Sequence, residues 1–222
     1  MSRIIAIGDI HGCNRTFQKL VHEGIQPSKS DHIYCIGDYV DRGPDSKGVI
    51  DFILHLRKKG YKIHTLRGNH EQMMIDSVGN TKNREDWYLN GGDTTLKSFG
   101  VTHFEHMDHV YQDFFRRTRY FYLTDDYIFV HAGLNFRRDD PFTDRSAMLW
   151  TRSFQYDPVK AGGRTLIHGH TPEPLELIAQ RKQEGVINID AGCVYKSKER
   201  FGNLAAFDLT HEEWIVVRNC ED

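Results

Sequence analysis

The sequence lacks the features that would place the protein in a membrane or an oxidising compartment. No apolar run approaches the roughly 18 residues of a membrane span, and the N-terminus carries no secretory signal. No Cys-x-x-Cys pair is present, and the scattered cysteines are Cys13, Cys35, Cys193 and Cys220. Free thiols in a reducing compartment are the simplest interpretation, so we expect a cytoplasmic protein.

The chain also lacks an excess of one charge. Lysine and arginine number 29 and aspartate and glutamate 31, which gives a formal net charge of -2. Without a basic field we expect neither nucleic acid nor an anionic membrane as a partner. Any phosphate chemistry must then come from a local site. Nothing in the sequence indicates an oligomeric state.

Linker-like segments rich in proline or serine, internal repeats and low-complexity stretches are absent as well. A length of 222 residues fits one domain with a full core, and 39% hydrophobic with 27% charged residues is ordinary globular composition. We therefore expect a single domain over residues 1–222. A polar, mostly helical stretch at about 72–118 is interpreted as an insertion in it.

The first third of the chain alternates between strand and helix patterns. Apolar runs at 3–8, 32–37 and 61–66 predict buried strands, and helical spacing of apolar residues fills 14–24 and 45–60. This alternation is typical of a layered α/β fold with parallel strands. From residue 120 onwards, short β-rich runs predict a second sheet packed on the first.

Metal-capable side chains follow one predicted strand after another. These strand-end residues are Asp9, His11, Asp38, Asn69, His70, His131, His168 and His170. In layered α/β sheets, ligands collect beyond the carboxyl ends of the strands. Carboxylate oxygen, imidazole nitrogen and amide oxygen together suit a first-row divalent metal. A single such residue is usually a turn or a hydrogen-bonded group, but recurrence at five strand ends favours one shared metal site.

The order of these motifs resembles a known family. "GDIHG" (8–12), "GDYVDRG" (37–43), "LRGNHE" (66–71), "HAG" (131–133) and "GHTP" (169–172) are similar to the phosphoprotein phosphatase (PPP) family of binuclear metallophosphoesterases. The bacterial and phage-type serine/threonine protein phosphatases are the most similar members. The resemblance implies a calcineurin-like domain: a four-layer αββα sandwich of two mixed β-sheets flanked by helices.

The resemblance also implies two divalent metals bridged by one carboxylate and a water. The first metal would be held by Asp9, His11 and Asp38, and the second by Asp38, Asn69, His131 and His170. A metal-bridging hydroxide would attack phosphorus in line, without a covalent intermediate. Manganese is expected, with iron or zinc as alternatives, because neutral imidazole and amide ligands suit magnesium less well.

Two further pairs of residues acquire roles from the resemblance. His70 would protonate the leaving alkoxide while Asp41 keeps its imidazole charged and oriented. Arg42 would form bidentate hydrogen bonds with the phosphate oxygens. The segment "MLWTR" is a weaker match to the family and would supply Arg152 as a second phosphate-binding residue. Arg67 and Glu71 are expected to be structural partners.

One histidine in "HGHTP" stays ambiguous. His168 and His170 are two residues apart, so on a strand both would point to the same side and either could reach a metal. The family pattern selects His170. A separate group, His103, His106 and His109, is interpreted as a solvated helix because no strand motif brings other ligands to it.

The leading functional interpretation is hydrolysis of phosphate monoesters, with phosphoserine or phosphothreonine of a protein or peptide as substrate. The alternative keeps the site and changes the substrate to a dinucleoside polyphosphate such as diadenosine tetraphosphate, with Trp87 and Tyr88 as a base-stacking surface. "GHTP" favours the protein phosphatase. A metal-binding module without turnover is disfavoured, because His70, Asp41 and Arg42 are all present.

Overall fold

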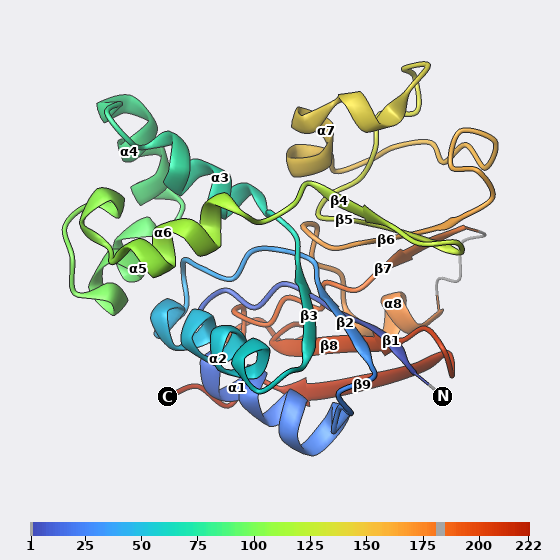
Figure 1. The fold of residues 1–222 in the computed structure, drawn as a ribbon, viewed down its shortest axis with the longest axis horizontal. Coiled ribbons are helices and arrows are strands. Elements are labelled where there is room, and N and C mark those ends of the chain that lie inside the picture. Colours follow the sequence, from blue (N-terminus) through green and yellow to red (C-terminus); the bar gives the residue numbers. More distant parts are fainter. Residues whose placement is uncertain (1, 181–184) are drawn as a thin grey trace.

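Two β-sheets pack face to face, with helices outside them (Figure 1). The computed structural model describes residues 2–180 and 185–222. The strands are β1 (Ile4–Ile7), β2 (His32–Cys35), β3 (Lys62–Thr65), β4 (Phe121–Leu123), β5 (Tyr127–Val130), β6 (Thr165–His168), β7 (Val186–Asn188), β8 (Asn203–Asp208) and β9 (Glu213–Arg218). This arrangement confirms the predicted sandwich of two mixed sheets flanked by helices.

Helices connect and cover these strands. They are α1 (Asn14–Lys19), continued by the π-helical η1 (Leu20–Ile25), α2 (Ser46–Lys58), α3 (Asn69–Asp76), α4 (Thr81–Leu89), α5 (Gly92–Phe99), α6 (His109–Arg116), α7 (Arg145–Trp150) and α8 (Leu175–Gln180), with 3-10 turns η2 (Phe104–His106) and η3 (Pro141–Thr143). Asp45 caps α2 by accepting a hydrogen bond from the backbone of Gly48. Among the described residues, no helix has the length and apolarity to cross a bilayer.

The first sheet has the order β3-β2-β1-β8-β9, and the second has the order β4-β5-β6-β7. Strands β1, β2 and β3 are parallel, as are β5, β6 and β7. The prediction that all β-rich runs after residue 120 join the second sheet is wrong for β8 and β9. Strand β8 pairs antiparallel with β1, because local alternation identifies a strand but not its partner.

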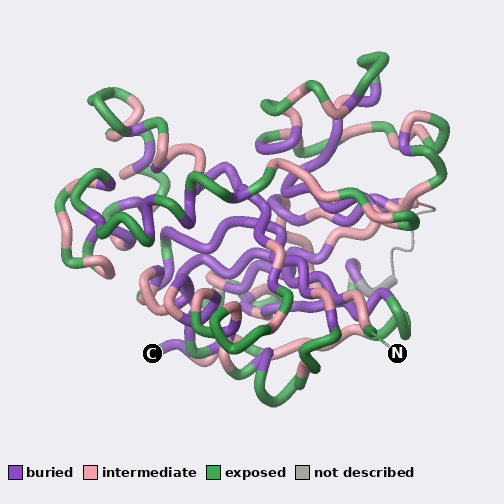
Figure 2. Tube along the Cα trace, viewed as in Figure 1, coloured by how far each residue is buried: buried purple, intermediate pink, exposed green. Residues whose placement is uncertain are grey.

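Both faces of the first sheet are covered, which explains its nearly continuous apolar strands. Between the sheets, the ring of Tyr34 stacks on Phe129 with centroids 3.9 Å apart. On the opposite face, Ile33 of β2 belongs to the same buried cluster as Phe17 of α1 and Ile53 of α2. The strand centres are accordingly the most buried part of the molecule (Figure 2).

Helices α3 to α6 lie together beside the first sheet, at the upper left of Figure 1. Their shared core includes the fully buried Trp87, Phe104 and Phe115. The chain returns to the sheet where the backbone N–H of Arg67 donates to the carbonyl of Arg119 over 2.7 Å. The helical pattern agrees with the sequence, while the interpretation of 72–118 as an insertion within one domain stays a prediction.

Candidate active site

The parallel strands of both sheets end at one edge, and the metal-capable residues follow these ends. Asp9 comes after β1, Asp38 after β2, Asn69 after β3, His131 after β5 and His170 after β6. Together with His11, they are no more than 8% exposed. Since a buried polar side chain must find a partner or bind a ligand, this edge is a built site and not a set of solvated turns.

The backbone around the site is strained. In the described part of the chain, seven residues other than glycine have positive φ, and five of them are predicted site residues: His11, Asp38, Asp41, Arg42 and His170. A non-glycine residue held there costs of order 1–3 kcal/mol, and such conformations persist where surrounding contacts enforce them. Glu71 supplies such contacts, because its carboxylate accepts the backbone N–H groups of Asp38 and Tyr39 at 2.9 and 2.8 Å.

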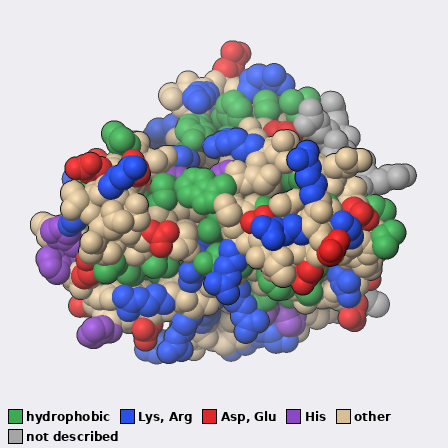
Figure 3. Space-filling model, turned by 90° about the horizontal axis from the view of Figure 1, so that it is seen from above, with side chains coloured by type: hydrophobic (Ala, Val, Ile, Leu, Met, Phe, Trp, Pro, Cys, Tyr) green, Lys and Arg blue, Asp and Glu red, His purple; other side chains and the backbone are tan. Residues whose placement is uncertain are grey.

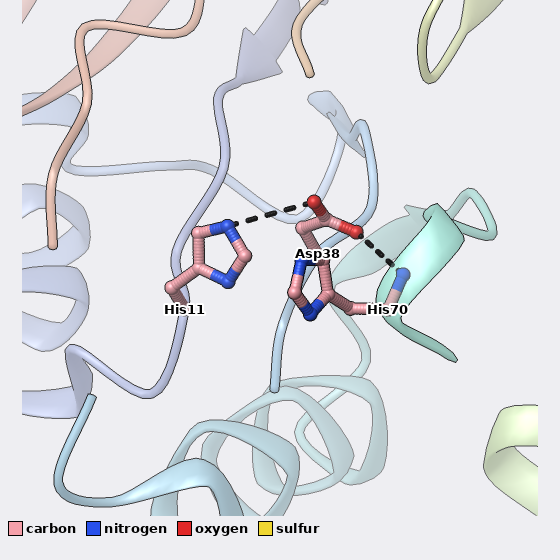
Figure 4. A group of neighbouring side chains, drawn as sticks. All are labelled: His11, Asp38 and His70. Atoms are coloured by element: carbon pink, nitrogen blue, oxygen red, sulfur yellow. Dashed lines mark hydrogen bonds and ion pairs between the residues drawn. The ribbon is translucent and has the colours of Figure 1, made fainter. Parts of the chain in front are cut away.

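One group of potential ligands consists of His11, Asp38 and His70, whose donor atoms all lie within 4.8 Å of one another. His11 and His70 flank Asp38 in Figure 4, with His11 Nε2 at 3.5 Å from Asp38 Oδ2. The Nδ1–H of His11 donates to the carbonyl of Val40 over 2.9 Å. That bond fixes the tautomer and turns the Nε2 lone pair toward Asp38, as a ligating histidine requires.

A second group consists of Asp38, His131 and His170. His131 donates from Nδ1 to the carbonyl of Ile36 over 2.9 Å, which leaves its Nε2 facing Asp38 Oδ2 at 3.5 Å. Asn69 Oδ1 lies 3.0 Å from His131 Nε2 and 2.9 Å from His170 Nδ1. Asp38 Oδ2 is therefore shared by the two groups, the arrangement that a bridging carboxylate needs.

Asp9 belongs to neither of the two groups. Its Oδ2 accepts the backbone N–H of His170 over 3.1 Å. Within the described residues, the buried side-chain polar atoms that have no hydrogen-bond partner are Asp9 Oδ1 and His170 Nε2. Leaving such an atom unpaired costs about 1–3 kcal/mol, so both atoms fit ligands of a divalent cation better than structural groups.

The electrostatics of the two buried aspartates differ. Burial raises the pKa of Asp9 well above its usual value, and the negative charges of Asp190 and Asp38 raise it further. Burial alone would do the same to Asp38, but the surrounding imidazoles, His131 first, hold its pKa below the usual range. A cation placed between these carboxylates would relieve their repulsion.

The two predicted phosphate-binding arginines flank the cluster and are exposed. The Nη1 of Arg42 donates to His11 Nε2 over 2.9 Å, and its guanidinium lies 5.7 Å from the ring centre of Tyr195. One nitrogen cannot accept this N–H and ligate a metal at once, so metal binding at His11 requires Arg42 to turn away. The charge of the second arginine, Arg152, acts on His170. Burial first, and then the positive charges of His131 and Arg152, lower the pKa of His170 to about 3.

His70, a member of the first group, also forms a buried pair with Asp41. Their Nδ1–Oδ2 distance is 2.6 Å, and both side chains are almost fully buried. Asp41 also accepts hydrogen bonds from Trp87 Nε1 at 2.9 Å and Thr95 Oγ1 at 2.6 Å. Burial would lower the pKa of His70, but Asp38 and Asp41 together raise it above the usual value. The imidazole is thereby poised to hold and release a proton.

Two details of the sequence interpretation are wrong. Trp87 is fully buried beneath Asp41, so it cannot offer a face to a nucleobase. His168 and His170 do not share a side, because β6 ends at His168 and His170 follows in a left-handed conformation with φ 66°. His168 instead packs against Phe154, with ring centres 5.5 Å apart, and belongs to neither ligand group.

The interpretation of His103, His106 and His109 as one solvated helix is wrong, because His106 ends the 3-10 turn η2 and His109 begins α6. Within the described residues, the two groups above are the clusters able to hold a metal, and His103, His106 and His109 are not among them. The guanidinium of Arg67 donates to backbone carbonyls, including Phe115 at 3.2 Å and Arg116 at 2.8 Å. It therefore fastens the end of α6 to the strand end after β3.

Two residues at the site were not predicted from the sequence. Asp190 follows β7 as another parallel strand end, is 3% exposed and lies beside Asp9. Burial raises its pKa to about 7. Its signal was present, because "VINID" is an apolar run ending in aspartate. Thr95 had no such signal, since it stands 54 residues from Asp41, the residue it contacts.

The site faces a hollow in the surface. In Figure 3, histidine side chains are visible in this hollow, with hydrophobic, lysine and arginine side chains around it. Donor groups lie at the bottom and cationic groups at the rim, an arrangement suited to a metal-bound phosphate.

Comparison with known proteins agrees with this geometry. Residues 2–205 match the family model described as calcineurin-like phosphoesterase. The asymmetrical bis(5'-nucleosyl)-tetraphosphatase PrpE of Oceanobacillus iheyensis is 25% identical over 97% of this chain and 92% of that protein. Serine/threonine-protein phosphatase 1 of Salmonella typhimurium is 38% identical, but the match covers 39% of this chain and 38% of that protein.

Solved structures show the same fold. A candidate diadenosine tetraphosphatase superposes with a TM-score of 0.68 at 20% identity, covering all of this chain and 95% of that one. A serine/threonine phosphatase of Saccharomyces cerevisiae gives a TM-score of 0.66 at 15% identity, covering 100% of this chain and 81% of that one. The strand-end ligand geometry and the match over 2–205 lead to one conclusion: the chain belongs to the calcineurin-like phosphoesterases.

Proposed function

We propose that this phosphoesterase cleaves the polyphosphate bridge of dinucleoside polyphosphates. The observation that carries the proposal is the extent of similarity: the match to the dinucleoside tetraphosphatase PrpE runs through 97% of the chain, while the match to the serine/threonine phosphatase covers 39%. Further relatives named symmetrical bis(5'-nucleosyl)-tetraphosphatases match shorter segments. The alternative substrate considered from the sequence, a dinucleoside polyphosphate, is therefore better supported than a phosphoprotein.

The residues fit two divalent cations, which we propose are held by Asp9, His11 and Asp38 on one side and by Asp38, Asn69, His131 and His170 on the other. When bound, such ions neutralise phosphate oxygens and activate a water for in-line attack. Manganese suits this nitrogen-and-oxygen donor set, and iron or zinc would also fit it.

The protein's own groups position and protonate the substrate. Arg42 and Arg152 bind the free phosphate oxygens, since guanidinium groups offer paired, permanently charged donors. Water adds its oxygen to phosphorus, the bond to the leaving oxygen breaks, and that oxygen takes a proton from His70. Asp41 orients the imidazole through the 2.6 Å hydrogen bond. One water is consumed for each bond cleaved.

Hydrolysis of phosphoserine or phosphothreonine is a second candidate, and the buried His70–Asp41 pair favours it. An alkoxide is a much poorer leaving group than a nucleotide phosphate, so a built proton donor helps most with alkyl esters. Both candidates use the same metal centre and differ in what surrounds it.

The experiment compares two substrates on manganese-loaded protein, a phosphothreonine peptide and diadenosine tetraphosphate. The variant Asp9→Asn serves as the blank. We expect kcat/KM to favour the dinucleotide by about tenfold or more, about 1.4 kcal/mol in transition-state free energy. Chromatography identifies the cleaved bond, because AMP with ATP marks asymmetrical attack and two ADP mark symmetrical attack. A tenfold preference for the peptide would instead support the protein phosphatase.

A further inference from the structure

A cleft of about 1230 Å³ lies on the side of the second sheet, beside the two groups of potential metal ligands, which together are called the cluster below. Its walls come from the loop after β5, from helix α7 and from the segment after α7, and they include Leu134, Phe136, Trp150, Thr151, Phe154 and Tyr156. No residue of this cleft has been used in the catalytic scheme above. Its volume is ample for a small organic ligand, since such sites occupy about 300–1,000 Å³.

The cleft is joined to the catalytic residues by two short connections. The ring centre of Trp150 lies 6.4 Å from that of His170, with the planes nearly perpendicular at 86°. The loop that begins with His131 is tied to α7, because the backbone N–H of Ala132 donates to the carbonyl of Met148 over 2.8 Å. A ligand in the cleft is therefore held in a fixed position relative to a phosphate at the cluster.

The lining suits a flat aromatic group. Trp150 is 45% exposed, which leaves part of a large ring open beside the site. In the same lining, Phe136 packs against Phe154 and Tyr156, with ring centres 6.1 and 5.5 Å apart, so this part of the wall is aromatic. Nucleobases stack on exposed aromatic faces of this kind regardless of base identity.

The charges at the rim suit the phosphates that accompany a base. Arg137 and Arg138 line the cleft together with two acidic residues, Asp144 and Asp157, and Asp144 pairs with Arg138 at 3.1 Å. Arg152 directly follows the lining residue Thr151 in the chain and is exposed. The cleft therefore carries charges of both signs, and Arg137 and Arg152 are exposed cations that can meet the phosphates attached to a base.

We propose that this cleft is the nucleoside subsite and that Trp150 stacks on the base of a dinucleoside polyphosphate whose bridge lies at the cluster. The inference rests on the proposed function and identifies Trp150 as the residue that favours a substrate with a nucleoside. Trp87 cannot take this part because it is buried, and the ring of Tyr195 is covered by Lys198, whose Nζ lies 4.5 Å from its centre.

The test measures kcat/KM for diadenosine tetraphosphate and for para-nitrophenyl phosphate, which has no nucleoside. The ratio of interest is kcat/KM for the dinucleotide divided by kcat/KM for para-nitrophenyl phosphate. In Trp150→Ala this ratio should fall about tenfold or more, in keeping with the loss of one stacked base. Trp150→Phe keeps a ring and should retain most of the ratio. Leu89→Ala, which truncates an 87% exposed apolar residue on α4, is the matched control and should leave the ratio as it is.

A binding measurement gives a readout without turnover. AMP titrated onto the protein should quench tryptophan fluorescence in the wild type, and the quench should be absent in Trp150→Ala. Circular dichroism and thermal melting establish that each variant is folded. If the alanine variant is not, Trp150→Phe replaces it in the fluorescence titration, where the quench should also be absent.

The outcomes separate the two proposals. Wild-type turnover of the dinucleotide with an unchanged ratio and an unchanged quench in Trp150→Ala would overturn the subsite while leaving the proposed function intact. Turnover of para-nitrophenyl phosphate with none of the dinucleotide in the wild type would overturn both.

Discussion

Strand β2 has a buried aspartate near each end, and the two are used differently. Asp31 immediately precedes the strand and Asp38 follows it, and each is 2% exposed. Asp31 accepts the backbone N–H of Arg3 and of Ser28, both at 2.9 Å, and pairs with the guanidinium of Arg3 at 2.8 Å. Asp38 Oδ1 accepts the backbone N–H of His70 at 3.1 Å, but its Oδ2 faces the imidazole nitrogens of His11 and His131 at 3.5 Å, which is long for a hydrogen bond.

The difference separates a structural carboxylate from a candidate ligand. At the start of the strand, the oxygens of Asp31 are satisfied by the chain itself. At the other end, the acceptor atoms of Asp38 and its neighbours lie close together, as ligands of one cation do. Among the residues that the structure describes, Asp9 Oδ1 has no hydrogen-bond partner. Changes at the first end should therefore alter stability, and changes at the second end should alter metal binding and catalysis.

The largest expected effect is on catalysis. His70→Asn removes the proton donor, so kcat for a simple alkyl phosphate should fall about 10²- to 10⁴-fold. The loss should be much smaller for para-nitrophenyl phosphate, whose leaving group needs little protonation. Steady-state kinetics on both esters measure the contrast. Equal losses on the two would remove the proton-donor role of His70.

A smaller effect is expected from Asp190, which lies beside Asp9 without belonging to the proposed ligand set. Asp190→Asn removes a charge that supports Asp9 in binding a cation, and partners of ligating groups typically contribute 10- to 100-fold in metal affinity. Titration with Mn²⁺ should show affinity reduced by about that factor, with the melting temperature of the metal-free protein changed little. Unaltered affinity would make Asp190 a purely structural group.

At the opposite end of β2, Asp31→Asn should act on stability. Burial raises the pKa of Asp31, but hydrogen bonds from Arg3 and Ser28 outweigh it and lower the value from 3.8 to about 2. The folded pKa lies below the unfolded one, so the stabilisation is present above about pH 4. It is lost as the pH falls through about 2.

This shift corresponds to about 2 kcal/mol of unfolding free energy at pH 7. Urea denaturation of Asp31→Asn and wild type should show that difference at pH 7 and a shrinking one below pH 4. Turnover at pH 7 by the folded variant should stay near wild type. A pH-independent difference would mean that the charge of Asp31 contributes nothing.

The smallest effect belongs to an ion pair on the surface. Lys47 and Asp51 are 2.6 Å apart on α2, four residues from each other, with side chains 38% and 45% exposed. Exposed helical pairs contribute about 0.3–0.5 kcal/mol. Lys47→Ala should lower stability by no more than that, as measured by urea denaturation, and a loss above 1 kcal/mol would show that short distance outweighs exposure here.

Much of this site could be predicted because its signals are local. A strand followed by a glycine-flanked aspartate or histidine is read within a few residues, and the topology then brings Asp9, Asp38 and His131 to one edge. Partners far along the chain gave no signal. The contact of Thr95 with Asp41 and the pairing of β8 with β1 depend on how the chain folds back, which no local pattern encodes.

The directions in which side chains point from the loops also could not be predicted from the sequence. The rule that alternate residues share a side holds along a strand, and it fails at His170 because the backbone has already left β6. Likewise, aromatic composition suggested Trp87 as a stacking surface, whereas its indole N–H is used inside the protein to support Asp41.

The most direct test of the account is the number of manganese ions bound per chain, measured by calorimetric titration and by metal analysis after dialysis. Because Asp38 Oδ2 is shared by both ligand groups, the wild type should bind two ions, Asp31→Asn should also bind two, and Asp38→Asn should lose both. Two ions retained by Asp38→Asn, or none bound by the folded wild type, would contradict a binuclear centre at this edge.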